Sequence, residues 1–247
     1  MKGFLQEYGI IMVVVAVVLG MLTFGKTGYA KGIQDAILGS ADHIVETGEN
    51  IVPKPVKASD TINIEGTEHV VLEQKENNQA LVMTANSVGD RVFQLNVDDY
   101  TDLRPDGQNA NTYENSTIDN YLENEWYNSL SSTMKTAIQS TNIKQFSYYN
   151  PSQVYNTISR HVFLSSVGEV GKIVDLNNKD KIKAFSNIKL WTRDGFGYNK
   201  ISAMILNPAA NSNVDDNTVY TYNGIRPAFV IDLSKVDYKV TGHVDYK

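Results

Sequence analysis

The chain has 247 residues, a net charge of −6 and no cysteine. The absence of cysteine excludes disulfides, thiol chemistry and cysteine-based metal sites. The acidic balance argues against a nucleic-acid partner, which requires a basic surface.

An uncharged apolar block near the start is the first recognisable element. It runs from Ile10 to Phe24, and the wider segment from Tyr8 to Gly25 has about 18 residues, near the lower limit for a helix that crosses a bilayer. The block therefore predicts that the chain is exported or held in a membrane. The remainder is expected to work outside the cytoplasm.

Three interpretations of this block are open. A cleaved secretory signal would use Lys2 as its basic start and be cut after Ala30. A permanent anchor would keep Lys2 inside the cell and the large domain outside. A pilin-type stalk would pack the block against copies of itself.

The residues from Gly3 to Ile11 (GFLQEYGII) resemble the start of type IV pilins, particularly the Flp/Tad type, in which Glu-Tyr precedes the apolar helix. The resemblance implies that Glu7 of one subunit meets the amino terminus of its neighbour. The implied partners are the membrane and further copies of the chain in a helix-bundle filament, a homo-oligomer. The residues assigned to anchoring and assembly are Glu7, Tyr8, Ile11, Val14, Val18 and Leu22.

An amphipathic stripe follows the apolar block. Isoleucines recur at helical spacing from Ile33 to Ile51, and Pro53 and Pro55 then end the pattern. We expect a long hydrophobic and amphipathic stalk helix over residues 1–52, bent between Gly25 and Gly32. A linker is expected over 53–60, followed by a globular head over 61–247.

The head opens with segments that predict an antiparallel sheet. These strand-like segments are Thr61–Ile64, Val70–Leu72, Ala80–Asn86 and Arg91–Val97. Turn formers separate them, at Gly66, Asn77-Asn78 and Gly89-Asp90.

The pattern then changes to two helices and a series of short strands. Ser116–Asp119 has the form of a capping box, which marks the start of a helix. Ile118, Leu122 and Trp126 then recur at intervals of four residues, which predicts a helix of about three turns. A second helix is expected to start at Ser131 or Ser132 and to carry Met134 and Ile138. The later strands are expected at His161–Leu164, Leu190–Arg193, Ala203–Leu206, Thr218–Thr221 and Pro227–Ile231. This order indicates an α+β fold.

Four segments carry a family resemblance: Tyr113–Ser131 (YENSTIDNYLENEWYNSLS), Val162–Val170 (VFLSSVGEV), Trp191–Asp194 (WTRD) and Gly224–Leu233 (GIRPAFVIDL). Together they resemble a domain family of unknown function, frequent in surface proteins of Gram-positive bacteria, with N-S-x-I, W-L-R-S and G-V-R-P-A signatures. At two positions the chain departs from the pattern of this family: Asp119 stands in place of an Arg, and Tyr121 in place of a Trp. The resemblance spans about Thr61 to Asp237. It implies a C-type-lectin-like head of mainly antiparallel strands with two helices, displayed at the cell surface.

Structural roles are expected for the motif residues. They are Trp126, Trp191, Arg193, Arg226 and Pro227. Trp191 is expected to pack inward, and Arg193 to point outward or pair with an acid. Arg226 is expected to hold a turn through carboxylate or carbonyl groups, with Glu169 or Asp194 as partner.

Two late loops are the candidate ligand-binding region. They are expected at Asp194–Asn199 and Asn211–Asn217. The resemblance to C-type-lectin-like domains implies that such loops form the binding face, and exposed Phe196 and Tyr198 would suit sugar stacking or a protein contact. The tentative ligand-binding residues are Phe196, Tyr198, Asn199, Asn213 and Asp215.

Metal, cofactor and catalytic sites are not expected. The acidic clusters around Asp98–Asp106 and at Asp215-Asp216 lack EF-hand spacing. No nucleophile–base motif appears, so an enzyme is not expected. The preferred function is a pilin-like surface subunit, located in the membrane before assembly and at the cell surface afterwards, whose head serves adhesion or ligand binding. The alternative is a non-polymerising, membrane-anchored or secreted lectin-like adhesin that binds a glycan or a host or bacterial surface protein.

Overall fold

The computed structural model describes residues 55–98, 101–210 and 213–247. The stalk helix predicted over 1–52 and its assembly residues, from Glu7 to Leu22, lie outside these ranges, as do residues 53–54 of the predicted linker. Among the described residues, no helix is long and apolar enough to span a lipid bilayer. Residues 55–247 form one compact unit.

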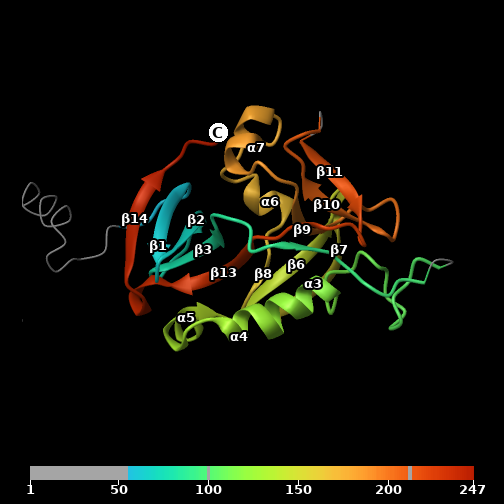
Figure 1. The fold of residues 1–247 in the computed structure, drawn as a ribbon, viewed down its shortest axis with the longest axis horizontal. Helices are drawn as coiled ribbons and strands as arrows, with labels where there is room; N and C mark the ends of the chain where they lie inside the picture. Colours follow the sequence, from blue (N-terminus) through green and yellow to red (C-terminus); the bar gives the residue numbers. More distant parts are fainter. Residues whose placement is uncertain (1–54, 99–100, 211–212) are drawn as a thin grey trace, which may run out of the picture. The chain divides into compact units, whose positions relative to one another are not determined.

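The first sheet gathers strands from both ends of the described chain (Figure 1). In spatial order its strands are β14 (Tyr238–His243), β1 (Asp60–Ile64), β2 (Thr67–Gln74), β3 (Gln79–Thr84), β13 (Pro227–Asp232) and β5 (Ile138–Gln139), with β8 (Phe163–Leu164) also paired to β13. All of these pairings are antiparallel. The turns at Glu65-Gly66 and Asn77-Asn78 have positive φ angles, as two-residue hairpin turns require.

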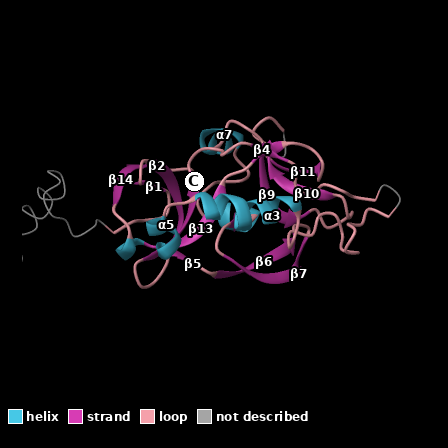
Figure 2. Cartoon of the chain, turned by 60° about the horizontal axis from the view of Figure 1, so that its bottom comes forward, coloured by secondary structure: helices cyan, strands magenta, loops and turns pink. Residues whose placement is uncertain are grey.

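The second sheet lies at the other end of the unit, as both ribbon views show (Figures 1 and 2). Its order is β11 (Val214–Thr218), β10 (Ser202–Leu206), β9 (Leu190–Gly195), β12 (Asn223–Gly224) and β4 (Asp90–Arg91). A long hairpin of β6 (Thr141–Ser147) and β7 (Asn150–Arg160) joins this sheet through β9. The pairs β12–β9 and β6–β9 are parallel, and the rest are antiparallel.

The helices are short and lie along two sides of the sheets (Figure 1). They are α3 (Thr117–Asn120), the π-helical η1 (Tyr121–Trp126), α4 (Tyr127–Ser129), α5 (Ser132–Ala137), α6 (Val167–Val170), α7 (Lys179–Phe185) and the 3-10 turn η2 (Leu233–Lys235). Ser116 and Ser131 cap α3 and α5, so both predicted helices are confirmed, although Ile138 falls in β5. Helices α6 and α7 were not predicted.

The α+β class is therefore confirmed, with corrections to single strands. The predicted strand Arg91–Val97 ends at Arg91. Beyond it, Phe93 and Gln94 both donate their backbone N–H groups to the Val219 carbonyl and so do not continue the regular hydrogen bonding of a strand. The predicted strand Thr218–Thr221 was wrong beyond Thr218, where a turn begins. The predicted loop at 211–217 contains β11 from Val214 onward, because these polar residues pair with buried β10 along an exposed edge. Strands β6, β7 and β14 were not predicted.

Candidate functional site

Four aromatic side chains form a cluster where the β6–β7 turn meets the segment after β9. This aromatic cluster consists of Tyr148, Tyr149, Phe196 and Tyr198. The ring centroids of Tyr149 lie 5.1, 5.3 and 4.9 Å from those of Tyr148, Phe196 and Tyr198, respectively. Phe196 and Tyr198 are 5.6 Å apart. Each ring therefore contacts at least one other ring.

Local backbone geometry brings these rings together. Ser147 pairs with Asn150, so Tyr148 and Tyr149 form a two-residue hairpin turn. The Tyr148 N–H donates to the Gly195 carbonyl at the end of β9 (3.0 Å). At Gly197, φ is +96° and a Cβ atom would collide with the Ser147 side chain. Glycine is required there because it permits both the backbone angle and the close approach of the loop to the hairpin.

The aromatic cluster presents its outer rings to solvent. Tyr198 is 75% exposed and Tyr149 is 52% exposed, while Phe196 packs against the core. Partial burial raises the pKa of Tyr148 above its ordinary value, and the neighbouring Tyr149 and Asp194 act in the same direction. The exposed rings are uncharged, most of them meet edge to face, and the two exposed tyrosines carry phenol groups. Such a surface can stack against the apolar face of a sugar ring or an apolar side chain.

The structure brings together only part of the tentative binding set. The Asn199 side chain accepts from the backbone N–H groups of Ile201 and Ser202 (3.1 and 2.8 Å), so it shapes the loop next to the cluster. Asn213 is buried and donates to the Leu176 carbonyl, 3.4 Å away. Asp215 accepts from Asn207 at 3.2 Å.

The structure therefore does not bring all five residues together in the aromatic cluster. Asn213 and Asp215 belong to the far end of the β10–β11 hairpin, since Val214 pairs with Leu206 whereas Gly195, before Phe196, pairs with Ala203. Sequence reasoning also missed Tyr148 and Tyr149. Their Tyr-Tyr-Asn-Pro sequence after an alternating segment was the available signal.

Both tryptophans pack against other aromatic side chains. Trp191 is buried, lies 5.5 Å from the Phe93 ring and donates its indole N–H to the Arg91 carbonyl (2.8 Å). Trp126, at the end of η1, is partly buried and packs at 6.1 Å from the Phe229 ring of β13.

Arg193 pairs with an acid in the interior. Its side chain is in β9, and its two terminal nitrogens contact the two Glu169 carboxylate oxygens at 2.6 and 2.7 Å. Further donations reach the Lys144 and Leu164 carbonyls (2.7 and 2.9 Å), so Arg193 links the two sheets. Burial alone would raise the pKa of Glu169, but the charge and hydrogen bonds of Arg193 hold that pKa below its ordinary value.

Arg226 is held differently, between β12 and β13. Its Nε donates to the Thr84 carbonyl (2.5 Å) and its Nη1 to the Phe185 carbonyl (3.1 Å). The carbonyl contacts expected from the sequence are therefore present. Glu169, offered as its carboxylate partner, binds Arg193 instead. Pro227 begins β13 opposite Leu164 and restricts the backbone of the preceding Arg226 to extended conformations.

The profile of a known family matches residues 77–233. The chain belongs to the family described as Domain of unknown function (DUF6273). The DUF6273 segment contains the aromatic cluster, Arg193 and Arg226, and it is shorter than the Thr61–Asp237 span expected from the motifs. Strands β1, β2 and β14, neighbours in the first sheet, lie outside it. No curated protein and no solved structure matches the chain.

Acidic residues of the DUF6273 segment are used in internal contacts. Asp106 binds the buried Arg104 through both carboxylate oxygens (3.1 and 2.5 Å), and this hydrogen bonding lowers its pKa. Asp119 is buried and pairs with Arg160 at 2.9 and 2.7 Å. Within the described ranges, no three His, Asp or Glu side chains lie close enough together to hold a metal ion.

Proposed function

We propose that the chain is a pilin-like surface subunit whose globular head binds a ligand outside the cell. In this proposal, residues 1–52 hold the chain in the membrane and pack against other copies in a filament. The uncharged block from Ile10 to Phe24 and the preceding Glu7-Tyr8 support the proposal, because an apolar stem with one carboxylate is the pattern of a type IV pilin. The head over 61–247 would then be displayed on the fibre for adhesion.

The aromatic cluster is the observation that carries the binding role. Monomeric soluble proteins seldom expose contiguous apolar patches without a function. Here four rings contact one another, and a glycine at position 197 allows the approach. Tyrosines suit a wet interface because each presents an apolar face and a polar hydroxyl. The chemistry fits a glycan or an aromatic-rich protein surface.

A pair of double variants tests the binding role. Replacing Tyr149 and Tyr198 by Ala removes the exposed half of the cluster. The matched control replaces Tyr220 and Tyr222, which are 47% and 69% exposed and lie outside the cluster. We expect the first variant to lose binding to glycan arrays or to host-cell surfaces by tenfold or more. Equal binding by both variants would contradict the assignment.

Assembly is tested separately at the stem. Under the filament proposal, Glu7→Ala should abolish fibres seen by electron microscopy of surface material, because a carboxylate in an apolar bundle needs its partner. The control is Glu46→Ala, which changes a charged residue between the isoleucines of the predicted amphipathic helix and should leave fibres intact. Monomers confined to membrane vesicles would instead support the alternative, a single anchored adhesin. Mass spectrometry of the mature amino terminus decides whether residues 1–30 are retained.

A further inference from the structure

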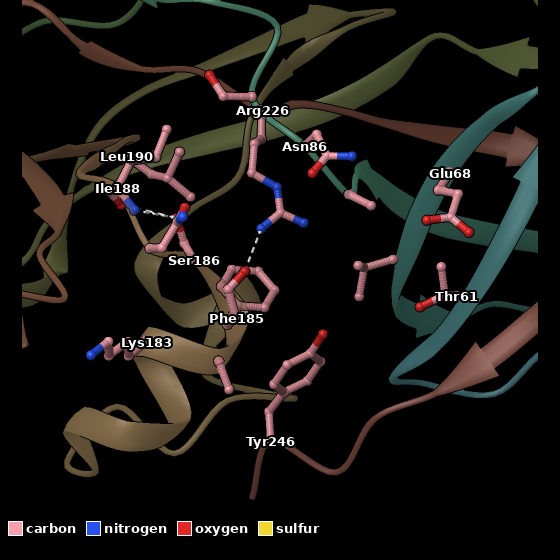
Figure 3. A pocket seen from close by; sticks show the side chains of 15 residues that line it. Thr61, Glu68, Asn86, Lys183, Phe185, Ser186, Ile188, Leu190, Arg226 and Tyr246 are labelled. Atoms are coloured by element: carbon pink, nitrogen blue, oxygen red, sulfur yellow. Dashed lines mark hydrogen bonds between the residues drawn. The ribbon is translucent and has the colours of Figure 1, made fainter.

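A pocket of about 440 Å³ lies between the first sheet and α7 (Figure 3). One wall comes from Thr61 of β1 and Glu68 of β2, and the other from the end of α7 at Phe185. Arg226 and Tyr246 complete the lining. The pocket is far from the aromatic cluster: it meets β9 at Leu190, whereas the cluster follows Gly195, about 16 Å further along the strand.

Arg226 presents an unpaired nitrogen to this pocket. The residue is only 4% exposed, and its guanidinium points into the pocket in Figure 3. Two of its nitrogens donate to the Thr84 and Phe185 carbonyls, but Nη2 is buried and has no hydrogen-bond partner in the described part of the chain. The guanidinium also stacks on the Phe185 ring, 4.4 Å from its centroid. The side chain is thus fixed by three contacts, with one donor group left over.

No carboxylate of the described residues forms an ion pair with this buried cation. Burial lowers the pKa of Arg226 to about 10, and among the described residues the charge of Tyr246 alone acts in the opposite direction. The acid that lines the pocket, Glu68, stands on the strand across from Arg226 and accepts from Thr241 at 3.3 Å. A buried charge without a partner is costly, and an unmet buried donor adds to that cost. An anion that entered the pocket would relieve both.

The lining indicates what kind of anion fits. Glu68 would repel a second negative charge, so a singly charged group suits the pocket better than a phosphate dianion. The Tyr246 hydroxyl and the Asn86 amide line the same space and have no hydrogen-bond partner among the described residues. They are available to hydroxyl groups of a ligand, as is the Glu68 carboxylate. The volume accommodates a single sugar ring.

We propose that this pocket binds a sugar acid, with the ligand carboxylate on Nη2 of Arg226 and its hydroxyl groups on the opposite wall. The inference concerns a site separate from the aromatic cluster and does not depend on the adhesion role. Variants of Tyr149 and Tyr198 should therefore leave it unchanged.

Isothermal titration of the full chain in mild detergent with glucuronate tests the proposal. We expect the wild-type chain to bind glucuronate, and its uncharged methyl ester at least tenfold more weakly. Arg226→Gln should weaken glucuronate binding by a similar factor. The control Lys183→Gln removes a charge at the rim of the same pocket and should change the affinity less than threefold, because exposed charges are screened.

A second variant keeps the test decisive if Arg226→Gln does not fold. Thr61→Trp fills the pocket from the opposite wall, leaves Arg226 intact and should also abolish binding. The proposal is overturned if glucuronate does not bind the wild type, if the ester binds equally well, or if binding survives Thr61→Trp in a folded chain.

Discussion

Two buried arginines, Arg193 and Arg226, are embedded to the same degree but in opposite electrostatic settings. Their exposed fractions are 3% and 4%. Arg193 has a bidentate partner in Glu169, with Asp194 also nearby, and these acids outweigh burial and raise its pKa. In the part of the chain that the structure describes, Arg226 has carbonyl partners and no carboxylate partner, and burial lowers its pKa. Burial of an arginine therefore does not define its role. Its role depends on whether a carboxylate lies close enough to compensate its charge.

The largest expected effect comes from removing Arg193. Arg193→Met leaves Glu169 and Asp194 buried without their cation, and should reduce the free energy of unfolding by about 3–5 kcal/mol. Urea unfolding followed by tryptophan fluorescence measures it. The double variant with Glu169→Leu also removes one of the two stranded acids and should recover part of the loss. No recovery would mean that packing, not charge pairing, sets the stability of this region.

Acid pH should affect the Arg193 region through Asp194. Burial raises the pKa of Asp194 to about 6, although Arg193 and two backbone N–H groups act against it. The folded state therefore holds this proton more tightly than the unfolded state. The associated stability is present below about pH 4 and is lost as the pH rises through 6.

Asp194→Asn isolates this contribution, because asparagine resembles the protonated acid at every pH. Between pH 4 and pH 7, the unfolding free energy of the wild type should fall relative to that of the variant by up to about 3 kcal/mol. Urea midpoints of both proteins at the two pH values provide the measurement. Parallel pH profiles would refute the raised pKa.

The matching substitution at the second arginine should cost less. Arg226→Met strands no acid, and it removes a charge that has no carboxylate partner. The loss of two hydrogen bonds to carbonyls should reduce the unfolding free energy by about 1–3 kcal/mol. If the loss equals that of Arg193→Met in the same urea experiment, the contrast between the two arginines is wrong.

The smallest effect on stability is expected at Tyr246. Its hydroxyl has no hydrogen-bond partner in the described structure, and its ring contact with Phe185, at 5.4 Å, survives in Tyr246→Phe. The unfolding free energy should change by less than about 0.5 kcal/mol. A larger loss would indicate that the hydroxyl already supports the Arg226 region without any ligand.

Local patterns in the sequence predicted much of this fold and one half of the candidate site. Gly66 and the Asn77-Asn78 pair marked hairpin turns, Ser116 marked a helix cap, and Phe196 and Tyr198 were expected near a binding loop. These are short-range signals, because each depends on neighbouring residues only.

The wrong predictions concern contacts between distant segments. Glu169 was offered to Arg226, but the placement of α6 against β9 gives it to Arg193, and nothing in the local spacing contains that information. Tyr149 and Phe196 are neighbours in the aromatic cluster although 47 positions separate them in the sequence. The polar strand β11 was missed because edge strands need little apolar character.

The pocket beside Arg226 is lined partly by the DUF6273 segment and partly by the chain that flanks it. Arg226 and Phe185 belong to that segment, whereas Thr61, Glu68 and Tyr246 come from the flanking chain. In the proposed sugar-acid site, Arg226 and Asn86 are therefore encoded in the DUF6273 segment, whereas Glu68 and Tyr246, which are offered to the hydroxyl groups of the ligand, come from the flanking chain. A change in the flanking strands could alter which molecule is accepted while the arginine and its supporting carbonyls stay in place.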